Sequence, residues 1–468
     1  MNIRDRQILH IAVPSIVSNI TVPLLGMVDV AIVGHMGNAA YMGAVAVGSM
    51  IFNLIYWLFG FLRMGTSGLT AQAYGRQDWT EATQVLRRSV LWGLGIALLL
   101  ILLQMPLRWL MFWIIGPTTD VSPLAVQYFR IVIWGSPAML SLYSLTGWFI
   151  GMQNTRIPMF ISIMQNVVNI LASLLLVYGF GMKIEGVATG TVIAQYAGLF
   201  MAIIFCLTAT LFPKESKISV STDVLHVDNG NSSPSGKETD GKSTSFFAIN
   251  RNIFLRTLCL VAVNLFFTAA GARQGAVILS VNTVILQLYL LFSYFMDGFA
   301  YAGEALGGRF YGAHDSKAFN ETLHHLFIWA IAVTVVFTTI YVFGGMWIVR
   351  LLTDEQPVIG FARNFICWAW IIPAAGATAF IWDGVFIGLT ATRGMLVSSA
   401  VSAFLFFFVF TLGDKWWTSS SDYRHPALLN HVLWLAQVIY LAMRGIIQTV
   451  WYRQRLAPII KQMTHNLQ

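Results

Sequence analysis

The sequence predicts an all-α membrane protein with about twelve transmembrane helices, arranged as two parallel six-helix repeats. Its apolar share is 57 % and its charged share only 10 %, with a mean hydropathy of +0.69. Soluble chains carry roughly a quarter charged residues. Apolar runs long enough to cross a bilayer recur along the whole length, and two segments recur at one constant spacing. A water-soluble fold is therefore excluded.

The apolar runs are expected to be helices, because lipid offers no hydrogen-bond partner to an open backbone and these runs are longer than barrel strands. In the first half, the predicted spans cover residues 8–34, 43–66, 88–110, 126–150, 159–180 and 186–210. In the second half, they cover residues 253–274, 277–302, 321–346, 361–387, 394–413 and 427–451.

A polar stretch separates the two halves. Residues 213–245 are rich in Ser, Gly, Asp, Asn and Lys and carry few large apolar side chains, a composition typical of a flexible linker. We therefore predict an N-terminal lobe over 1–211, a cytoplasmic linker over 212–246, a C-terminal lobe over 247–452 and a cytoplasmic tail over 453–468.

The formal net charge of +8 is explained by membrane topology. Most basic residues outside the predicted spans fall on the side that carries both termini and the linker, for example Arg87, Arg88, Lys214 and Arg453, whereas few fall opposite. The positive-inside rule then places both termini in the cytoplasm, with the chain in the plasma membrane. No nucleic-acid partner is expected.

The two halves are related by one constant shift along the chain, which takes Leu69 to Leu306. Leu69-Thr-Ala-Gln-Ala-Tyr-Gly-Arg-Gln-Asp78 corresponds to Leu306-Gly-Gly-Arg-Phe-Tyr-Gly-Ala-His-Asp315, and Phe149-Ile-Gly151 corresponds to Phe386-Ile-Gly388. Six helices return the chain to the side on which it began. The repeats are therefore parallel, related by an axis along the membrane normal, which is typical of transporters with a site between two halves. We interpret the Gly-rich segments 65–75 and 303–312 as short cytoplasmic connections that allow close helix packing, and a hinge or coupling role during rocking of the lobes is the alternative.

Several motifs resemble the multidrug and toxic compound extrusion (MATE) family. They are Pro14…Asn19…Asp29-Val-Ala-Ile-Val-Gly34, Leu69–Gly75, Phe149-Ile-Gly151 and Asn166-Val-Val-Asn169. Phe61-Leu-Arg63, Gly271-Ala-Arg273 and the segment from Asp297 to Glu304 look like its DinF branch. The resemblance implies two six-helix lobes in a V shape and export coupled to inward movement of H⁺ or Na⁺.

Asp29 is the main candidate for ion coupling, because an ionisable side chain within a spanning helix is costly and is expected to have a task or a partner. A desolvated carboxylate favours its protonated form, and a nearby cation favours the charged form, so such a group can alternate. Pro14 and Pro23 remove backbone donors from the same helix and favour bends. The structural alternative is a permanently neutral or hydrogen-bonded aspartate near a helix end.

The fifth span supplies polar partners. Asn166, Asn169 and Ser173 are three and four residues apart and share one helix face. In the family that this chain resembles, an Asp often occupies the position of Ser173 and joins the first-helix carboxylate, and a Thr corresponding to Thr191 belongs to the same network. With one carboxylate fewer, the Asp29 site suits Na⁺ less well, so H⁺ is the expected coupling ion.

A second polar network is predicted in the C-terminal half. Asp297, Tyr301 and Glu304 lie on one face of the eighth span, and we expect Arg273 to neutralise one of these acids. Asp383 is a candidate second coupling site, and Arg63 is expected to pair or to reach the membrane surface. A purely structural ion-pair network is the alternative for these residues.

These observations favour a monomeric, cation-coupled antiporter that exports organic, often cationic or amphiphilic, compounds. A flippase for a lipid-linked precursor is the alternative, because Arg63 and Arg273 would place cations in the interior. A membrane enzyme or receptor ranks last, since the sequence has no metal cluster, nucleophile constellation or phosphate loop. No cofactor beyond the coupling ion is expected.

Overall fold

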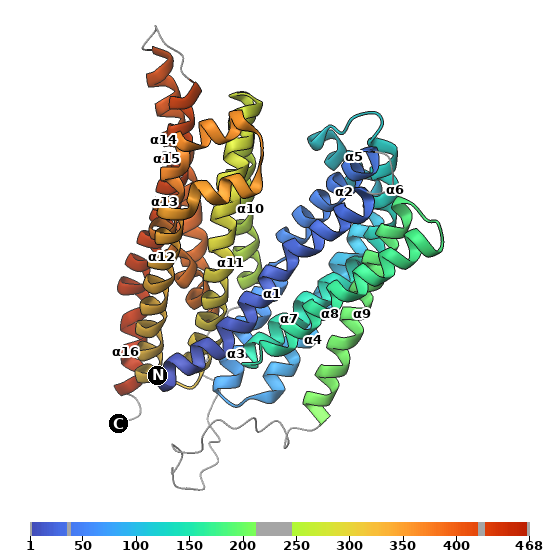
Figure 1. Cartoon of the computed structure of the whole chain (residues 1–468). Helices are drawn as coiled ribbons and strands as arrows, with labels where there is room; N and C mark the ends of the chain where they lie inside the picture. The colour runs from blue at the N-terminus through green and yellow to red at the C-terminus, as the bar shows by residue number, and fades with distance from the viewer. Residues whose placement is uncertain (1, 35–38, 212–245, 420–425, 466–468) are drawn as a thin grey trace.

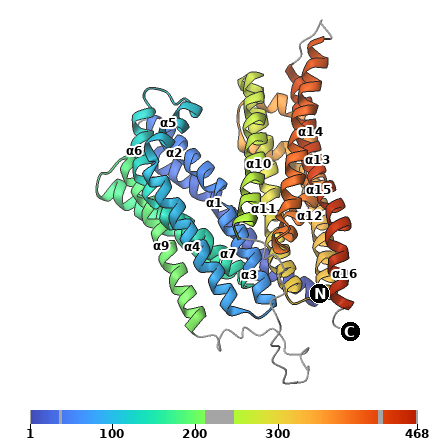
Figure 2. The same cartoon turned by 180° about the vertical axis from the view of Figure 1, so that it is seen from behind.

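The computed structural model describes residues 2–34, 39–211, 246–419 and 426–465, and within these some side chains, including those of residues 22–31, are left out. Regular structure in the described ranges is helical throughout. Figure 1 shows two helical bundles that meet at one end and diverge toward the other, and Figure 2 shows the same V from behind. We call the end that carries both chain termini the closed end and the opposite one the open end. The predicted linker lies outside the described residues.

The first lobe contains the helices before the linker, and its element bounds are α1 (Ile3–Gly34), α2 (Ala39–Leu58), α3 (Phe61–Gly75), α4 (Trp79–Leu102), α5 (Gln104–Ile115), α6 (Ser122–Val132), η1 (Ile133–Gly135), α7 (Ser136–Gly151), α8 (Arg156–Leu174), η2 (Leu175–Gly179) and α9 (Ile184–Leu211). The second lobe contains α10 (Phe246–Arg273), α11 (Ala276–Gly312), α12 (Ser316–Leu352), α13 (Gln356–Gly388), α14 (Thr392–Ser419), α15 (Pro426–Trp451), η3 (Tyr452–Leu456) and α16 (Ala457–His465).

Ten of the described helical segments are long and apolar enough to span a membrane. Helix α1 and the α6–α7 pair, which is interrupted by one short 3₁₀ turn, cover the two remaining predicted spans. The expectation of about twelve transmembrane helices is thereby confirmed. Several helices differ from the predicted spans, and the predicted span 88–110 is broken at Leu103 into α4 and α5. Helix α3 continues to Gly75 and α11 to Gly312, so the Gly-rich segments interpreted as cytoplasmic connections are helical and largely buried.

The repeat seen in the sequence reappears in the backbone. Asp78 and Asp315 each cap the following helix by accepting a hydrogen bond from the backbone N–H three residues later, both at 2.8 Å. Four non-glycine residues of the described ranges have positive φ, and they form two pairs related by the shift: Gln77 with His314 and Gln153 with Thr390. Matching caps and matching left-handed turns show that the repeats have the same direction and the same local geometry.

Glycines allow the helices to cross closely within each lobe. A Cβ on Gly147 would clash with the carbonyl oxygen of Arg63, and a Cβ on Gly384 would clash with that of Ala300. The repeat shift relates Gly147 to Gly384 and also relates the two carbonyl oxygens that they would meet. Large side chains are therefore excluded from the α3–α7 and α11–α13 crossings, as expected for helices that associate through backbone proximity in lipid.

The lobes touch through another such pair at the closed end. A Cβ on Gly75 of α3 would clash with the Arg309 carbonyl oxygen, and a Cβ on Gly312 of α11 would clash with the Gln72 carbonyl oxygen. The Gln72 amide also donates to the Gly388 carbonyl oxygen at 2.8 Å. The repeat axis therefore passes between α3 and α11, at a contact made mostly of backbone.

Helix α1 contacts both lobes. Its first half packs on α11, where Ala12 and Ile16 lie against Gly298. Its second half packs on α8, where the Thr21 hydroxyl lies 3.1 Å from that of Ser162. Because Pro14 has no N–H, the His10 carbonyl oxygen lacks its usual helical donor, and the Thr155 hydroxyl donates to that oxygen at 3.5 Å and to the Ile11 carbonyl oxygen at 3.1 Å.

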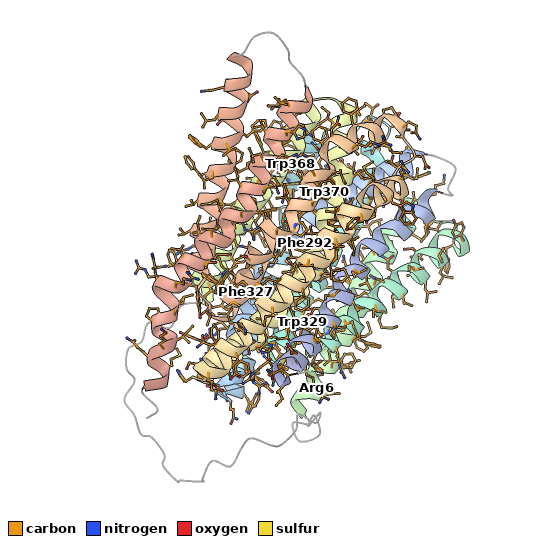
Figure 3. The ribbon with its side chains drawn as sticks, turned by 60° about the vertical axis from the view of Figure 1, so that its left-hand side comes forward. Arg6, Phe292, Phe327, Trp329, Trp368 and Trp370 are labelled. Atoms are coloured by element: carbon orange, nitrogen blue, oxygen red, sulfur yellow. The ribbon has the colours of Figure 1, made fainter. Side chains whose placement is uncertain are left out.

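The second lobe has an aromatic core (Figure 3). Phe292 makes edge contacts with Phe337 and Phe380, with ring centroids 5.6 and 6.1 Å apart. Trp370 donates its indole N–H to the Tyr341 carbonyl oxygen at 2.9 Å, and Trp368 donates to His431 at 3.0 Å. Packed rings and tryptophans with satisfied donors stabilise the core of this lobe.

Candidate functional site

A buried ion pair joins the two lobes. Arg63 of α3 lies 3.6 Å from a carboxylate oxygen of Glu304 on α11, and its guanidinium lies 4.3 Å above the Tyr301 ring. The side chains are 13 % and 1 % exposed, so the pair is separated from bulk water. Separating the lobes at this point would leave a buried charge without its partner, which is costly in free energy. The ion pair therefore stabilises the arrangement in which α3 and α11 are in contact.

The continuous helix in this region explains the position of Arg63. Arg63 lies twelve residues before the end of α3, which is about 18 Å along the helix axis from the closed end. Of the two sequence-based expectations for Arg63, pairing is therefore correct and surface snorkelling is not. The predicted grouping of Tyr301 and Glu304 on one face is also confirmed, since both contact the same guanidinium.

The predicted partner of these acids is wrong. Arg273 is the last residue of α10, is exposed and lies at the open end, far from Glu304 along the membrane normal. Glu304 pairs instead with Arg63, which belongs to the first lobe. Asp297 is half-buried on the same helix as Glu304 and lies within electrostatic range of Arg63 and Asp383.

The second lobe contains a buried polar cluster around Asp383. Arg256 of α10 and Arg444 of α15 both donate to Oδ2 of Asp383, and the Gln448 amide donates to Oδ1 at 2.6 Å. The two arginine side chains are each 6 % exposed and the aspartate side chain 11 %. With two guanidinium groups and an amide on one carboxylate, the group is held in its charged form and has little capacity left for a further cation.

The sequence analysis identified Asp383 but missed its partners. Arg256 and Arg444 lie inside the predicted seventh and twelfth spans, so the rule that intramembrane charges are functional or paired would have found both. Both arginines meet the Asp383 carboxylate of α13, and this meeting of three helices is decided by the tertiary structure. The sequence carries no signal for it.

The predicted polar face of the fifth span is present in the first lobe. The Asn169 amide donates to the Thr191 hydroxyl of α9 at 3.2 Å, and the Asn166 amide donates to the Thr21 carbonyl oxygen of α1 at 2.9 Å. Asn169 and Ser173 are fully buried. Among the described side chains, neither Asn169 Oδ1 nor Ser173 Oγ has a hydrogen-bond partner.

Asp29 belongs to the described part of α1, but its side chain lies outside the described residues. The backbone of α1 follows α8 from the Thr21–Ser162 contact to the hydrogen bond that Tyr178 donates to the Ile32 carbonyl oxygen, at 3.5 Å. Residue 29 therefore sits on the stretch of α1 that runs beside the α8 segment containing Ser173.

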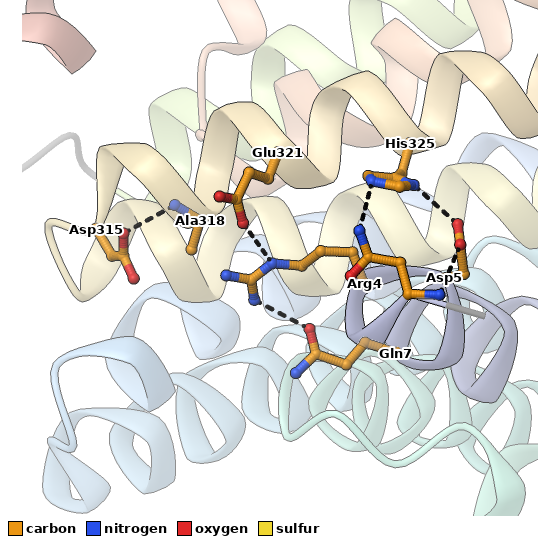
Figure 4. A network of polar contacts seen from close by, with 8 residues as sticks. Arg4, Asp5, Gln7, Asp315, Ala318, Glu321 and His325 are labelled. Atoms are coloured by element: carbon orange, nitrogen blue, oxygen red, sulfur yellow. Dashed lines mark hydrogen bonds and ion pairs between the residues drawn. The ribbon is translucent and has the colours of Figure 1, made fainter. Parts of the chain in front are cut away.

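A surface network closes the contact between the lobes beside the N-terminus (Figure 4). Arg4 of α1 pairs with Glu321 of α12 at 3.1 Å, and Asp5 accepts hydrogen bonds from Trp329 at 3.0 Å and from His325 at 2.9 Å. Desolvation raises the pKa of Asp5, but the hydrogen bonds from Trp329 and His325 outweigh it, so the pKa lies below its ordinary value.

Metal ligands of the usual kinds do not gather in the described part of the chain, where no three His, Cys, Asp or Glu side chains form a cluster. The described polar groups are instead amides, hydroxyls and matched ion pairs.

Comparison with known proteins agrees with this architecture. The chain matches the family model described as MatE over residues 14–175 and 253–412. It is 35 % identical over 451 residues to DNA damage-inducible protein F of Escherichia coli (strain K12), a match that covers 96 % of this chain and 92 % of that protein.

Solved structures share the whole fold. A crystal structure described as MATE in the bent conformation superposes with a TM-score of 0.80 at 16 % identity, covering 99 % of this chain and 98 % of that one. An outward-facing structure of a multidrug resistance MATE family transporter gives a TM-score of 0.74 at 16 % identity, with 99 % and 97 % covered. The V-shaped pair of six-helix lobes and the motif order lead to one assignment: this chain is a membrane transporter that belongs to the MatE family and is similar to DNA damage-inducible protein F.

Proposed function

We propose that this protein is a proton-coupled antiporter that exports organic, often cationic or amphiphilic, compounds, and that Asp29 is its coupling residue. It acts as a monomer in the plasma membrane, with both termini and the closed end in the cytoplasm. The excess of basic residues on the side of the termini supports this orientation.

One observation carries the assignment of Asp29. The repeat shift relates Asp29, Asn169 and Ser173 to Phe266, Phe406 and Phe410 of the second lobe. The Phe266 ring makes edge contacts with the rings of Phe406 and Phe410, with centroids 5.9 and 5.2 Å away. Since the lobes share backbone geometry, we infer that position 29 is the neighbour of the two buried oxygens that lack a described donor.

A proton fits this arrangement better than Na⁺. A protonated Asp29 donates one hydrogen bond and so satisfies one acceptor, whereas a dehydrated Na⁺ needs several oxygen ligands and compensating negative charge. Ser173 stands where a second carboxylate would add that charge. The amide nitrogen of Asn169 donates to Thr191, and its oxygen is available to accept a hydrogen bond from a protonated carboxyl group.

The shape of α1 links this site to the lobe contact. The helix is 32 residues long, about 48 Å, and is anchored on α8 near Asp29 and on α11 and α12 near the closed end. A change of charge at Asp29 alters how the second half of α1 packs on α8, and the same continuous helix transmits this change to the closed end. Alternation between two lobe arrangements is the expected result.

The flippase alternative is not favoured. It depended on cations in the interior, yet Arg63 is paired with Glu304 and Arg273 is exposed at the end of α10. Arg256 and Arg444 share a carboxylate within the second lobe.

The test uses proteoliposomes loaded with a fluorescent organic cation, under imposed H⁺ or Na⁺ gradients. Wild-type protein is expected to export the dye with ΔpH alone, and Asp29→Asn is expected to abolish this export while inserting normally. Asp120→Asn, which removes an exposed carboxylate of the same lobe, is the matched control and should behave as wild type. Full export by Asp29→Asn contradicts the residue assignment. Export that follows Na⁺ and ignores pH contradicts proton coupling.

A further inference from the structure

Two cavities at the open end occupy repeat-equivalent places, one in each lobe. The first lies between α5 and α6, has a volume of about 530 Å³ and is lined by Arg108, Trp109, Phe112, Trp113, Val126 and Arg130. The second lies between α12 and α13, has a volume of about 350 Å³ and contains Arg350 and Arg363. The repeat shift relates Trp113 to Arg350 and Val126 to Arg363.

The two cavities differ in charge. In the second lobe, Asp354 shares the lining with the two arginines and offsets one of their charges. In the first lobe, no carboxylate lines the cavity, and neither Arg108 nor Arg130 forms an ion pair with any described residue. The first cavity therefore presents two uncompensated guanidinium groups.

The first cavity opens onto a surface built to contact lipid. Pro106 cannot continue the regular hydrogen bonding of α4, so the chain breaks at Leu103 and restarts as α5. Exposed apolar residues continue across this break at intervals of three or four, a stripe formed by Leu91, Leu94, Leu98, Leu102, Met105, Trp109 and Trp113. The last two are 69 % and 72 % exposed and also line the cavity. Exposed tryptophans are typical of the headgroup level of a bilayer.

Arg130 lines the same cavity from α6. It is exposed and eight residues after Ser122, about 12 Å along the helix from its first residue. An exposed arginine on a lipid-facing surface needs an anion, and guanidinium groups bind phosphate oxygens in bidentate geometry. The nearest abundant anion is the lipid phosphate.

We propose that the cavity between α5 and α6 binds the phosphate of an anionic phospholipid from the leaflet at the open end. Arg108 and Arg130 hold the phosphate from two helices, and Trp109 and Trp113 contact the glycerol and the upper acyl chain. An anionic phospholipid is preferred over a zwitterionic one because two positive charges face the headgroup and no carboxylate of the described lining is present to receive an ammonium group.

The experiment compares lipid retention and thermal stability of the full-length purified chain. Native mass spectrometry with phosphatidylglycerol or phosphatidylcholine counts bound lipid, and tryptophan fluorescence gives the unfolding midpoint at each lipid concentration. Arg108→Gln/Arg130→Gln is expected to weaken phosphatidylglycerol binding about thirtyfold, since each basic residue near the headgroups contributes about 1 kcal/mol. The preference over phosphatidylcholine should disappear.

Three controls make the outcome decisive. Arg350→Gln/Arg363→Gln changes the equivalent cavity of the second lobe and should leave the preference for phosphatidylglycerol intact. Arg108→Lys/Arg130→Lys keeps the charge and should retain part of the binding, which separates electrostatic recognition from misfolding. Inorganic phosphate at the same concentration should neither compete nor stabilise. Unchanged preference in the Arg108→Gln/Arg130→Gln variant, or full competition by inorganic phosphate, would overturn the proposal.

Discussion

The two lobes share one backbone plan but put their polar chemistry in different places. Where the second lobe packs Phe266 against Phe406 and Phe410, the first lobe has Asp29, Asn169 and Ser173 at the equivalent positions. Positions that form an aromatic cluster in the second lobe are thus occupied by polar residues in the first.

The reverse exchange occurs around Asp383. Where the second lobe assembles Asp383 with Arg256 and Arg444, the first lobe has Thr146, Asn19 and Leu207 at the equivalent positions. We propose that the duplicated scaffold divides its roles: the ion cluster and the aromatic cluster stabilise the second lobe, whereas the polar positions of the first lobe serve coupling.

The largest effect on stability is expected when the Asp383 carboxylate loses its charge, and this change tests the proposed division of roles. Asp383→Asn leaves two buried guanidinium groups without a counter-charge and is expected to cost about 3–5 kcal/mol of stability. Thr146→Val, at the equivalent position of the first lobe, should change stability little. Thermal unfolding in detergent measures both. If Asp383→Asn folds as stably as wild type but loses transport, the cluster is a coupling site rather than a structural one.

Two truncations at repeat-equivalent positions compare the aromatic cluster of the second lobe with the polar positions of the first. Phe406→Ala empties an aromatic cluster and is expected to cost about 3 kcal/mol of stability or more, with transport reduced only in proportion to folded protein. Asn169→Ala, its equivalent, removes one intramembrane hydrogen bond worth about 0.6 kcal/mol but should strongly reduce ΔpH-driven export. If both variants lost the same amount of stability, the proposed division of roles between the lobes would be wrong.

The ion pair between the lobes is expected to have an intermediate effect. Glu304→Gln leaves Arg63 with only the Tyr301 ring and should cost about 2 kcal/mol in the state in which the closed end is sealed. The closed end should then open more often, seen as faster cysteine labelling at its buried positions. Arg63→Gln combined with Glu304→Gln should recover part of the loss, whereas no recovery would show that the two side chains act separately.

The repeat-equivalent glycines give a smaller and symmetric prediction. Gly147→Ala and Gly384→Ala each force a methyl group against a carbonyl oxygen, and each should cost about 1–2 kcal/mol. Unfolding midpoints of the two variants should fall by similar amounts. A large difference would mean that the helix crossings of the two lobes are not equally tight.

The smallest effect is expected at the surface network. The folded-state pKa of Asp5 is lowered, so its contribution is fully present above the ordinary aspartate pKa of about 3.9 and is lost as the pH falls through the lowered value. Asp5→Asn should therefore lower the unfolding midpoint slightly at pH 7 and not at a pH below the lowered pKa. A wild-type loss of the contact between pH 5 and 7 would exclude Asp5 as its cause.

The sequence alone determined the membrane class, the spans, the parallel repeat and the family. These features depend on local composition and on periodic or repeated motifs, which the chain displays without folding. It also identified Asp297, Glu304 and Asp383 as intramembrane acids, because charges in an apolar run are conspicuous.

Only the tertiary structure decided which charges meet. Arg63 and Glu304 are far apart in the chain and come from different lobes, and Arg273, which is closer to Glu304 in sequence, lies at the opposite end of its helix. The continuation of α3 and α11 through their Gly-rich ends was likewise decided by packing, since glycine is a poor helix former that becomes favourable where two backbones must touch. Pairing depends on the positions of whole helices, and those positions are set by contacts that no single segment encodes.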